Sequence, residues 1–127
     1  MLPMTAALVT KAEMAMATAR REMQVMDRPN FDAVAFHSSQ CAERYLKASL
    51  IEAGITFPDT HHLVVLLHLC LDSKPTWEAF RHHLCLLTTH GCLAEAPDLV
   101  IPRATAEQSL NLSLEFRGAV RTALGLA

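Results

Sequence analysis

The chain has 127 residues, of which 51% are hydrophobic, 19% are charged and only 4 are glycine. A chain of this length is expected to form one domain over residues 1–127, and its apolar fraction excludes an intrinsically disordered protein. The formal net charge of -2 gives no overall electrostatic reason to bind nucleic acid, because phosphate binding depends on clustered lysines and arginines.

The first predicted helix covers residues 5 to about 26. Apolar side chains recur there at steps of three and four residues, which is the helical period. They are Leu8, Ala12, Ala15, Ala19, Met23 and Met26. Pro29 ends this helix, because a proline biases the residue before it away from the helical region. Asn30 is placed to cap a second helix over residues 31–53, and Gly54 is placed to close it in a left-handed conformation.

Two further helices are predicted in the middle of the chain. Thr60 stands where the N-cap of a short third helix is expected, and this helix runs to about Leu71. Pro75 fits the first turn of a fourth helix, because the missing N–H group of a proline costs nothing there. This fourth helix covers about residues 76–94.

The last predicted helix runs from about Thr105 to Leu124. Thr105 and Gln108 have the spacing of a capping box, and Gly125 follows the last turn. The segment "DLVIP" is the one piece of chain that suggests an extended conformation. The sequence therefore predicts an all-α fold, an up-and-down bundle of four to five helices with a long N-terminal helical hairpin.

The N-terminal residues do not have the pattern of a targeting segment. They lack a basic region before an apolar core, so they do not read as a signal peptide. The longest uncharged run, residues 82–94, is much shorter than the roughly 20 apolar residues of a membrane span. We therefore expect a cytoplasmic protein without membrane contact. The mean hydropathy of +0.21 favours a homo-oligomer that buries apolar surface between subunits.

Histidine and cysteine are abundant, with seven and four residues, and three His-x-Cys pairs occur in the second half of the chain. Residues two apart on a helix point about 200° from each other, so such a pair cannot hold one metal ion. No C-x-x-C or H-E-x-x-H motif is present. We expect reduced, structural thiols and no metal or other cofactor; the alternative is metal storage or sensing by these side chains.

No motif of a nucleophilic enzyme or of a phosphate-binding loop is present. The chain lacks G-x-S-x-G, and none of its glycines belongs to a glycine-rich cluster. These absences give no support to a serine hydrolase or a P-loop protein. The residues alone therefore assign no catalytic group.

The segment "AFHSSQCAERYLKASLIEAGITFPDTHHLVVLL", residues 35–67, resembles the signature of HEPN domains. In that signature a helix of the form A-x-x-x-x-Q-x-A-E-x-x-L-K-A leads to a glycine, a proline and then T-H-x-L-x-x-L-L. The matching positions here are Ala35, Gln40, Ala42, Glu43, Leu46, Lys47, Ala48, Gly54, Pro58, Thr60, His61, Leu63, Leu66 and Leu67. The likeness continues, with fewer matching positions, through the last helix and covers about residues 6–124.

The resemblance implies a helical bundle that forms a homodimer. It also implies a protein partner, because many such proteins are encoded beside a minimal nucleotidyltransferase, in toxin–antitoxin-like or nucleotide-handling pairs. We therefore expect a non-catalytic homodimeric module that partners a nucleotidyltransferase and binds a nucleotide. The alternative is an atypical metal-independent HEPN ribonuclease that acts on RNA.

The chain departs from the pattern of the ribonucleases to which it is similar. Those enzymes resemble one another in an arginine that is followed, after four to six residues, by a histidine. Here Arg28 precedes His37 by nine positions, and Arg81 precedes His90 by nine. The R-Y-P turn of the family is replaced by Glu95-Ala96-Pro97. Ribonuclease activity is therefore not carried over to this chain.

Five polar residues of the family-like segment form the candidate site: Gln40, Glu43, Arg44, Lys47 and His61. They have two interpretations. In the first, Glu43 and Lys47 form a surface ion pair of i,i+4 spacing, while Gln40 and His61 tie the second helix to the third. In the second, they form with Arg44 a polar groove that binds a nucleotide or a phosphate of a partner.

Overall fold

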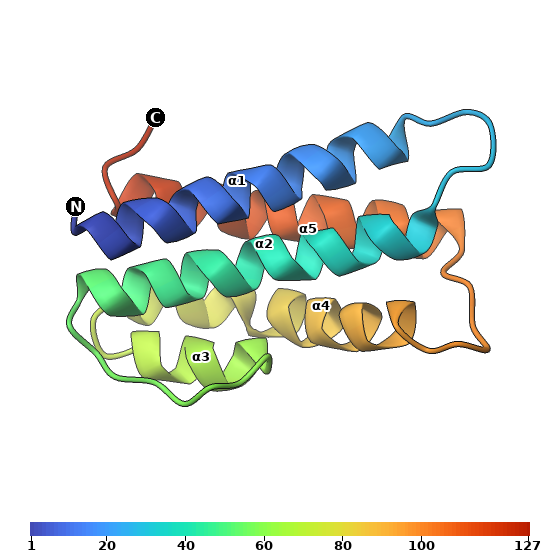
Figure 1. Cartoon of the computed structure of the whole chain (residues 1–127). Helices are drawn as coiled ribbons and strands as arrows, with labels where there is room; N and C mark the ends of the chain where they lie inside the picture. Colours follow the sequence, from blue (N-terminus) through green and yellow to red (C-terminus); the bar gives the residue numbers. More distant parts are fainter.

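The computed structural model describes all residues from 1 to 127, and it contains five α-helices, one 3-10 helix and no strand. The elements are α1 (Pro3–Met23), α2 (Phe31–Glu52), α3 (Leu63–Cys70), η1 (Pro75–Phe80), α4 (Arg81–Ala94) and α5 (Arg103–Ala123). Helices α1 and α2 form a long antiparallel hairpin, and the two chain ends lie at the same end of the bundle (Figure 1). The predicted all-α fold with an N-terminal hairpin is confirmed.

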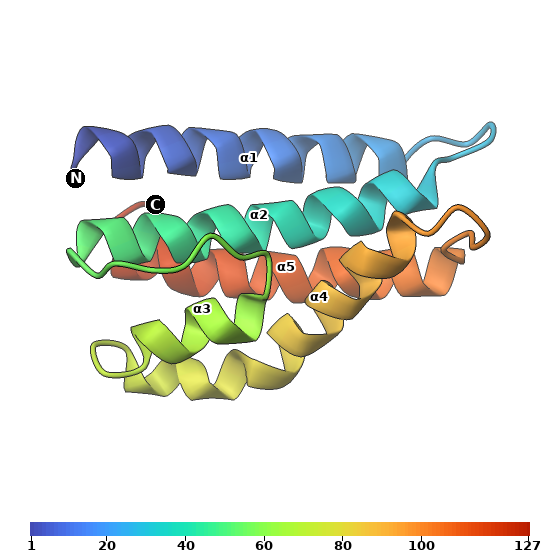
Figure 2. The same ribbon diagram turned by 60° about the horizontal axis from the view of Figure 1, so that its bottom comes forward.

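Helix α2 is the centre of the bundle. It contacts α1, α3, α4 and α5, and Figure 2 shows α1 on one side of it and α3 with α4 on the other. Its contact with α1 is lined by small side chains, among which Ala12, Ala19 and Ala35 have no solvent exposure. Small side chains let two helix backbones approach closely, so this hairpin forms one wall of the core.

Three of the predicted helix termini are confirmed. The Asn30 side chain accepts a hydrogen bond from the backbone N–H of Ala33 at 3.0 Å, so Asn30 caps α2. Gly54 follows the last turn of α2 with a φ of 71°, and Gly125 follows α5 with a φ of 74°. Both glycines adopt the left-handed conformation that residues with a side chain rarely take.

Two of the predicted helix starts are wrong. Thr60 does not cap α3, which begins after His62; the first N–H group of that helix, on Leu63, donates to the Thr88 hydroxyl of α4 at 3.2 Å. Thr105 forms no capping box, because α5 already begins at Arg103, directly after Pro102. The Thr88 hydroxyl, a neighbour in space, determines the start of α3, and the fixed φ of Pro102 determines the start of α5. Neither of them forms the side-chain capping pattern that the sequence suggested.

Other boundaries also differ from the predictions. Helix α1 ends at Met23, and Met26 is 94% exposed. The predicted fourth helix is divided into η1, whose first turn contains Pro75 as expected, and α4. The segment "DLVIP" forms no strand. Instead, its buried Ile101 donates a backbone hydrogen bond to the Asp32 carboxylate at 2.8 Å, which holds the connector against the start of α2.

A half-buried ionic network joins α1, α2 and α5. Two nitrogens of the Arg117 guanidinium donate to the Glu13 carboxylate at 2.6 and 2.7 Å, and the Tyr45 hydroxyl donates to it at 2.5 Å. The hydrogen bonds from Arg117 are the main reason why the pKa of Glu13 falls to about 2, although partial burial opposes this shift. Burial is the main cause that raises the pKa of Tyr45 to about 12.

Helices α2 and α4 approach each other closely at a glycine. A Cβ atom added to Gly91 of α4 would lie 2.9 Å from both Cβ and Oγ of Ser39 on α2. No real side chain tolerates such a separation without a shift of the neighbouring atoms. Gly91 is therefore required for the distance between these two helices.

Substitution of Gly91 by alanine tests this contact. Alanine in a helix is normally more stable than glycine, but here its Cβ must push α4 away from Ser39, so we expect Gly91→Ala to lower the free energy of unfolding by about 1–3 kcal/mol. Gly118 of α5 is the matched control, because a Cβ there meets nothing within 4 Å, and Gly118→Ala should stabilise by about 0.5–1 kcal/mol. Urea unfolding measures both changes.

A second background makes this test specific. Ser39→Gly removes the atoms that the new Cβ would meet, so Gly91→Ala should cost less in that background than in the original protein. Stabilisation by Gly91→Ala equal to that by Gly118→Ala would show that the two helices do not touch there.

The pH dependence of stability tests the network around Glu13. Because the pKa of Glu13 in the folded protein, about 2, lies below its ordinary value of 4.5, its contribution to stability is present above pH 4.5 and is lost as the pH falls towards 2. After allowance for solvent screening, Glu13→Gln should cost about 1–2 kcal/mol at pH 7. Urea unfolding of both proteins between pH 7 and pH 2 should show this difference shrinking. A difference that does not change with pH would refute the ionic origin of the contribution.

Candidate functional site

Four of the five predicted site residues lie together, and the fifth does not. Gln40, Glu43 and Lys47 lie on one side of α2, and His61 approaches them from the segment before α3. The Arg44 guanidinium instead donates a hydrogen bond to the backbone carbonyl of Lys11, on α1, at 3.3 Å. Neighbouring helix residues are separated by about 100° around the axis, which explains why Arg44 lies apart from Glu43.

Glu43 is a buried carboxylate with a residue exposure of 5%. One of its oxygens lies 2.9 Å from Nδ1 of His61, and the other accepts a hydrogen bond from Nζ of Lys47 at 3.1 Å. A carboxylate only accepts, so Nδ1 of His61 carries the proton and donates. The pair with Lys47 that the i,i+4 spacing predicts is present, but its carboxylate is buried and it also anchors the segment before α3.

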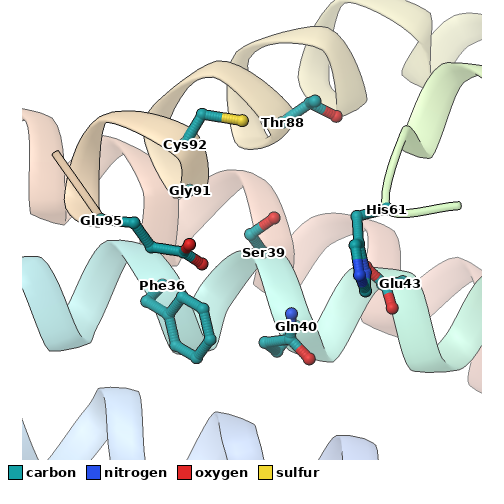
Figure 3. A pocket seen from close by; sticks show the side chains of 9 residues that line it. All are labelled: Phe36, Ser39, Gln40, Glu43, His61, Thr88, Gly91, Cys92 and Glu95. Atoms are coloured by element: carbon teal, nitrogen blue, oxygen red, sulfur yellow. The ribbon is translucent and has the colours of Figure 1, made fainter.

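A pocket of about 430 Å³ opens beside this carboxylate, between α2 and α4. Figure 3 shows the side chains around it. Helix α2 contributes Phe36, Ser39, Gln40 and Glu43, while helix α4 contributes Thr88, Gly91 and Cys92, and Glu95 follows directly after its end. His61 stands at one end of the pocket. A site of this size is within the range of small-molecule and side-chain pockets, about 300–1,000 Å³.

The two helices contribute to the pocket with the same spacing. Positions 36, 39, 40 and 43 of α2 follow the spacing i, i+3, i+4, i+7, which is one face of a helix. Positions 88, 91 and 92 of α4 and position 95 at its C-cap follow the same spacing. The sequence motif led to Gln40, Glu43 and His61 but missed the residues of α4. The repeated spacing is the sequence signal that could have identified these residues. Each helix carries a row of pocket residues with a small residue, Ser39 or Gly91, near its middle, and two such rows can face each other across a helix contact.

The hydrogen bonds of the pocket wall leave some polar groups free. The Thr88 hydroxyl is used twice, because it donates to the carbonyl of Leu84 at 3.0 Å and accepts from Leu63 at 3.2 Å. Ser39 has a residue exposure of only 9%, yet no hydrogen bond joins its hydroxyl to the protein, and it points into the space between the helices (Figure 3). The Glu95 carboxylate, which has no ion-pair partner, is also directed towards the pocket.

The pocket has an excess of hydrogen-bond acceptors and of negative charge. Its lining contains two carboxylates, Glu43 and Glu95, whereas no lysine or arginine lines it. The ammonium group of Lys47 is bound to Glu43, and only 16% of the Lys47 side chain is exposed. This arrangement suits a ligand that donates hydrogen bonds, and it is unfavourable for a phosphate group inside the pocket.

Other histidines are held by partners elsewhere in the bundle. Nε2 of His83 lies 2.6 Å from the Glu115 carboxylate, and Nδ1 of His90 lies 2.7 Å from the Ser109 hydroxyl. Burial lowers the pKa of His90. No three side chains of histidine, cysteine, aspartate or glutamate are grouped so that they could hold a metal ion.

All four cysteines are free thiols. Burial raises the pKa of Cys41 to about 12 and that of Cys70 to about 11. Cys85 and Cys92 are exposed on α4, and Cys92 alone of the four lines the pocket. The buried thiols therefore pack as small apolar groups, as expected from the sequence.

None of the helices combines the length and the apolar character that crossing a membrane requires. This finding includes α2, which with 22 residues is the longest helix.

The comparison with known families supports the resemblance of the segment 35–67. The family model of the HEPN domain matches residues 5–123, from the first turn of α1 to the end of α5. No curated protein sequence and no solved structure matches the chain. The match covers nearly the whole chain and agrees with the all-helical fold. The chain therefore belongs to the HEPN domain family.

Proposed function

We propose that this chain is a non-catalytic HEPN module that works as a homodimer in the cytoplasm and binds a minimal nucleotidyltransferase in a toxin–antitoxin-like or nucleotide-handling system. The observation that carries this proposal is the position of the family-like residues. Gln40, Glu43 and His61, which belong to the motif, meet at the pocket between α2 and α4. A family motif whose polar positions line a pocket is better explained by binding than by folding alone.

The exposed apolar side chains support association with another subunit. Met4 and Met14 of α1 are 59% and 57% exposed, and Val100 of the connector before α5 is 82% exposed. Large apolar side chains that remain in contact with water favour the burial of surface between protein chains. A homodimer and a protein partner would both use such surface.

The contacts of the histidines favour a binding module over the ribonuclease alternative. His61, His83 and His90 bind a glutamate, a glutamate and a serine. No hydrogen bond joins any histidine to an arginine. The arginines and histidines also lack the spacing of four to six residues that is typical of the ribonucleases to which the chain is similar. Cleavage of RNA that persists in a chelator would be the result that reinstates the alternative.

A nucleotide in the same pocket is the second candidate. The specific observation is the combination of an aromatic ring, Phe36, with the hydroxyl of Ser39 and the amide of Gln40 in a pocket of about 430 Å³. An aromatic ring can stack on a base, while hydroxyl and amide groups can bind its edge. In this arrangement the base would enter the pocket and the phosphates would remain outside, away from the carboxylates.

Blocking the pocket tests the proposed partner interaction. Cys92 is an exposed residue of the pocket lining, so Cys92→Trp should fill the opening without disturbing the core. Cys85, exposed two turns earlier on the same helix and outside the pocket, gives the control variant Cys85→Trp. With a minimal nucleotidyltransferase from the same genome, isothermal titration calorimetry should show binding that Cys92→Trp weakens at least tenfold and Cys85→Trp leaves unchanged.

Two further results belong to this experiment. Sedimentation over a concentration series should show a dimer for the original protein and for both variants. A monomer at every concentration, or the absence of any binding to the nucleotidyltransferase, would contradict the proposed function.

The nucleotide candidate makes a separate prediction. A nucleotide at 100 times its dissociation constant stabilises a protein by about 2.7 kcal/mol, which raises the unfolding temperature of a domain of this size by several degrees. If the pocket holds the nucleotide, Gln40→Ala should abolish this rise, whereas Arg44→Ala, outside the pocket, should preserve it. Thermal unfolding with mono-, di- and trinucleotides measures the shift, and no shift with any of them removes this candidate.

A further inference from the structure

We propose that the pocket between α2 and α4 binds the guanidinium group of an arginine side chain that the protein partner presents. This inference rests on the proposed function, because a partner must supply the arginine. It names the chemical group that the pocket recognises, and it assigns the main role in this recognition to the Glu95 carboxylate.

The charge of the pocket is the first argument. The Glu43 oxygens already accept hydrogen bonds from His61 and Lys47, whereas Glu95 faces the pocket without an ion-pair partner. The two carboxylates lie at opposite ends of the pocket in Figure 3, and the unpaired one, on Glu95, attracts a cation and repels a phosphate. A guanidinium group matches a carboxylate with two parallel N–H···O hydrogen bonds, a geometry that an ammonium group does not offer.

The Ser39 hydroxyl is the second and independent argument. Its residue is nine-tenths buried and no hydrogen bond to the protein satisfies it, although it points into the pocket (Figure 3). Its oxygen is not enclosed, because it opens to solvent through the pocket, so it is available to accept a hydrogen bond from a ligand. A guanidinium group has five N–H donors, enough to bind Ser39 and Gln40 while it also binds Glu95.

The aromatic ring of the pocket is the third argument. Phe36 lines the same pocket as Glu95, and arginine stacks on aromatic faces more readily than lysine does. The chain already uses this interaction elsewhere, since the Arg103 guanidinium lies 4.8 Å from the centre of the Phe31 ring. A ring, a free carboxylate and unpaired hydrogen-bonding groups together make a recognition site for arginine.

The test uses a model of the arginine side chain as the probe. N-acetyl-arginine amide carries the guanidinium without charged termini, and N-acetyl-citrulline amide is its uncharged analogue of nearly the same shape. In ¹⁵N–¹H NMR titrations of the full chain, the arginine probe should shift the backbone amides of Ser39, Gln40 and Glu95. The citrulline probe should bind at least tenfold more weakly, because it lacks the charge that the carboxylate attracts.

Two carboxylate variants complete the test. Glu95 is exposed and has no structural ion pair, so Glu95→Gln should keep the fold and weaken binding of the arginine probe at least tenfold, equivalent to about 1.4 kcal/mol. Glu107 on α5 is exposed and does not line the pocket, and Glu107→Gln should leave the affinity unchanged. The NMR spectrum of each variant without probe shows directly whether its fold is preserved.

Three results would overturn this inference. They are equal affinities for the arginine and citrulline probes, shifts confined to residues outside the pocket, and perturbation of the pocket amides by a nucleotide but not by the arginine probe. The failure of the proposed function is separate. If the chain binds the arginine probe in the pocket but binds no nucleotidyltransferase, the arginine site is supported. Only the proposed identity of the partner is then refuted.

Discussion

The contact between Gly91 and Ser39 sets the geometry on which the site depends. A Cβ at position 91 would lie 2.9 Å from the Ser39 side chain, so α4 can approach α2 only because this position is a glycine. Larger side chains, including Phe36 and Thr88, stand on both sides of this contact. They line the pocket. The same two small residues, Gly91 and Ser39, therefore set both the distance between the helices and the shape of the candidate site.

The buried Glu43 carboxylate joins the fold to the site. Its hydrogen bonds to His61 and Lys47 hold the segment before α3 against α2 and so fix one end of the pocket. Burying a carboxylate is costly unless both of its oxygens have partners, and here both do. Because the Lys47 ammonium group is engaged with Glu43, it is not free to bind a phosphate. The charge that remains free in the pocket is therefore negative, which directs the site towards cationic or hydrogen-bond-donating groups.

Much of the fold could be predicted from the sequence because it depends on local chemistry. The helical period, the Asn30 cap and the left-handed Gly54 all act through neighbours within one turn. The predicted starts at Thr60 and Thr105 were wrong because tertiary contacts and a proline decided them. The Thr88 hydroxyl, on a different helix, binds the first N–H of α3, and a hydroxyl distant in the sequence gives no local signal.

The candidate site was only half predictable, for a similar reason. Gln40, Glu43 and His61 belong to a continuous family-like segment, and the structure brings them together at the pocket. Arg44 belongs to the same segment, but its position on the helix turns it to α1. The pocket residues of α4 and the Glu95 that follows it belong to no motif. Their role depends on which helix faces α2, and a single sequence does not state that arrangement.

The central claim is that the pocket between α2 and α4 is where this HEPN module meets its partner. The most direct measurement is a map of the backbone amide shifts of the labelled chain upon addition of an unlabelled minimal nucleotidyltransferase from the same genome. We expect the largest changes at Ser39, Gln40 and Cys92, on the two sides of the pocket. Changes confined to the outer face of α1 or to α5, with the pocket amides unaffected, would contradict this account.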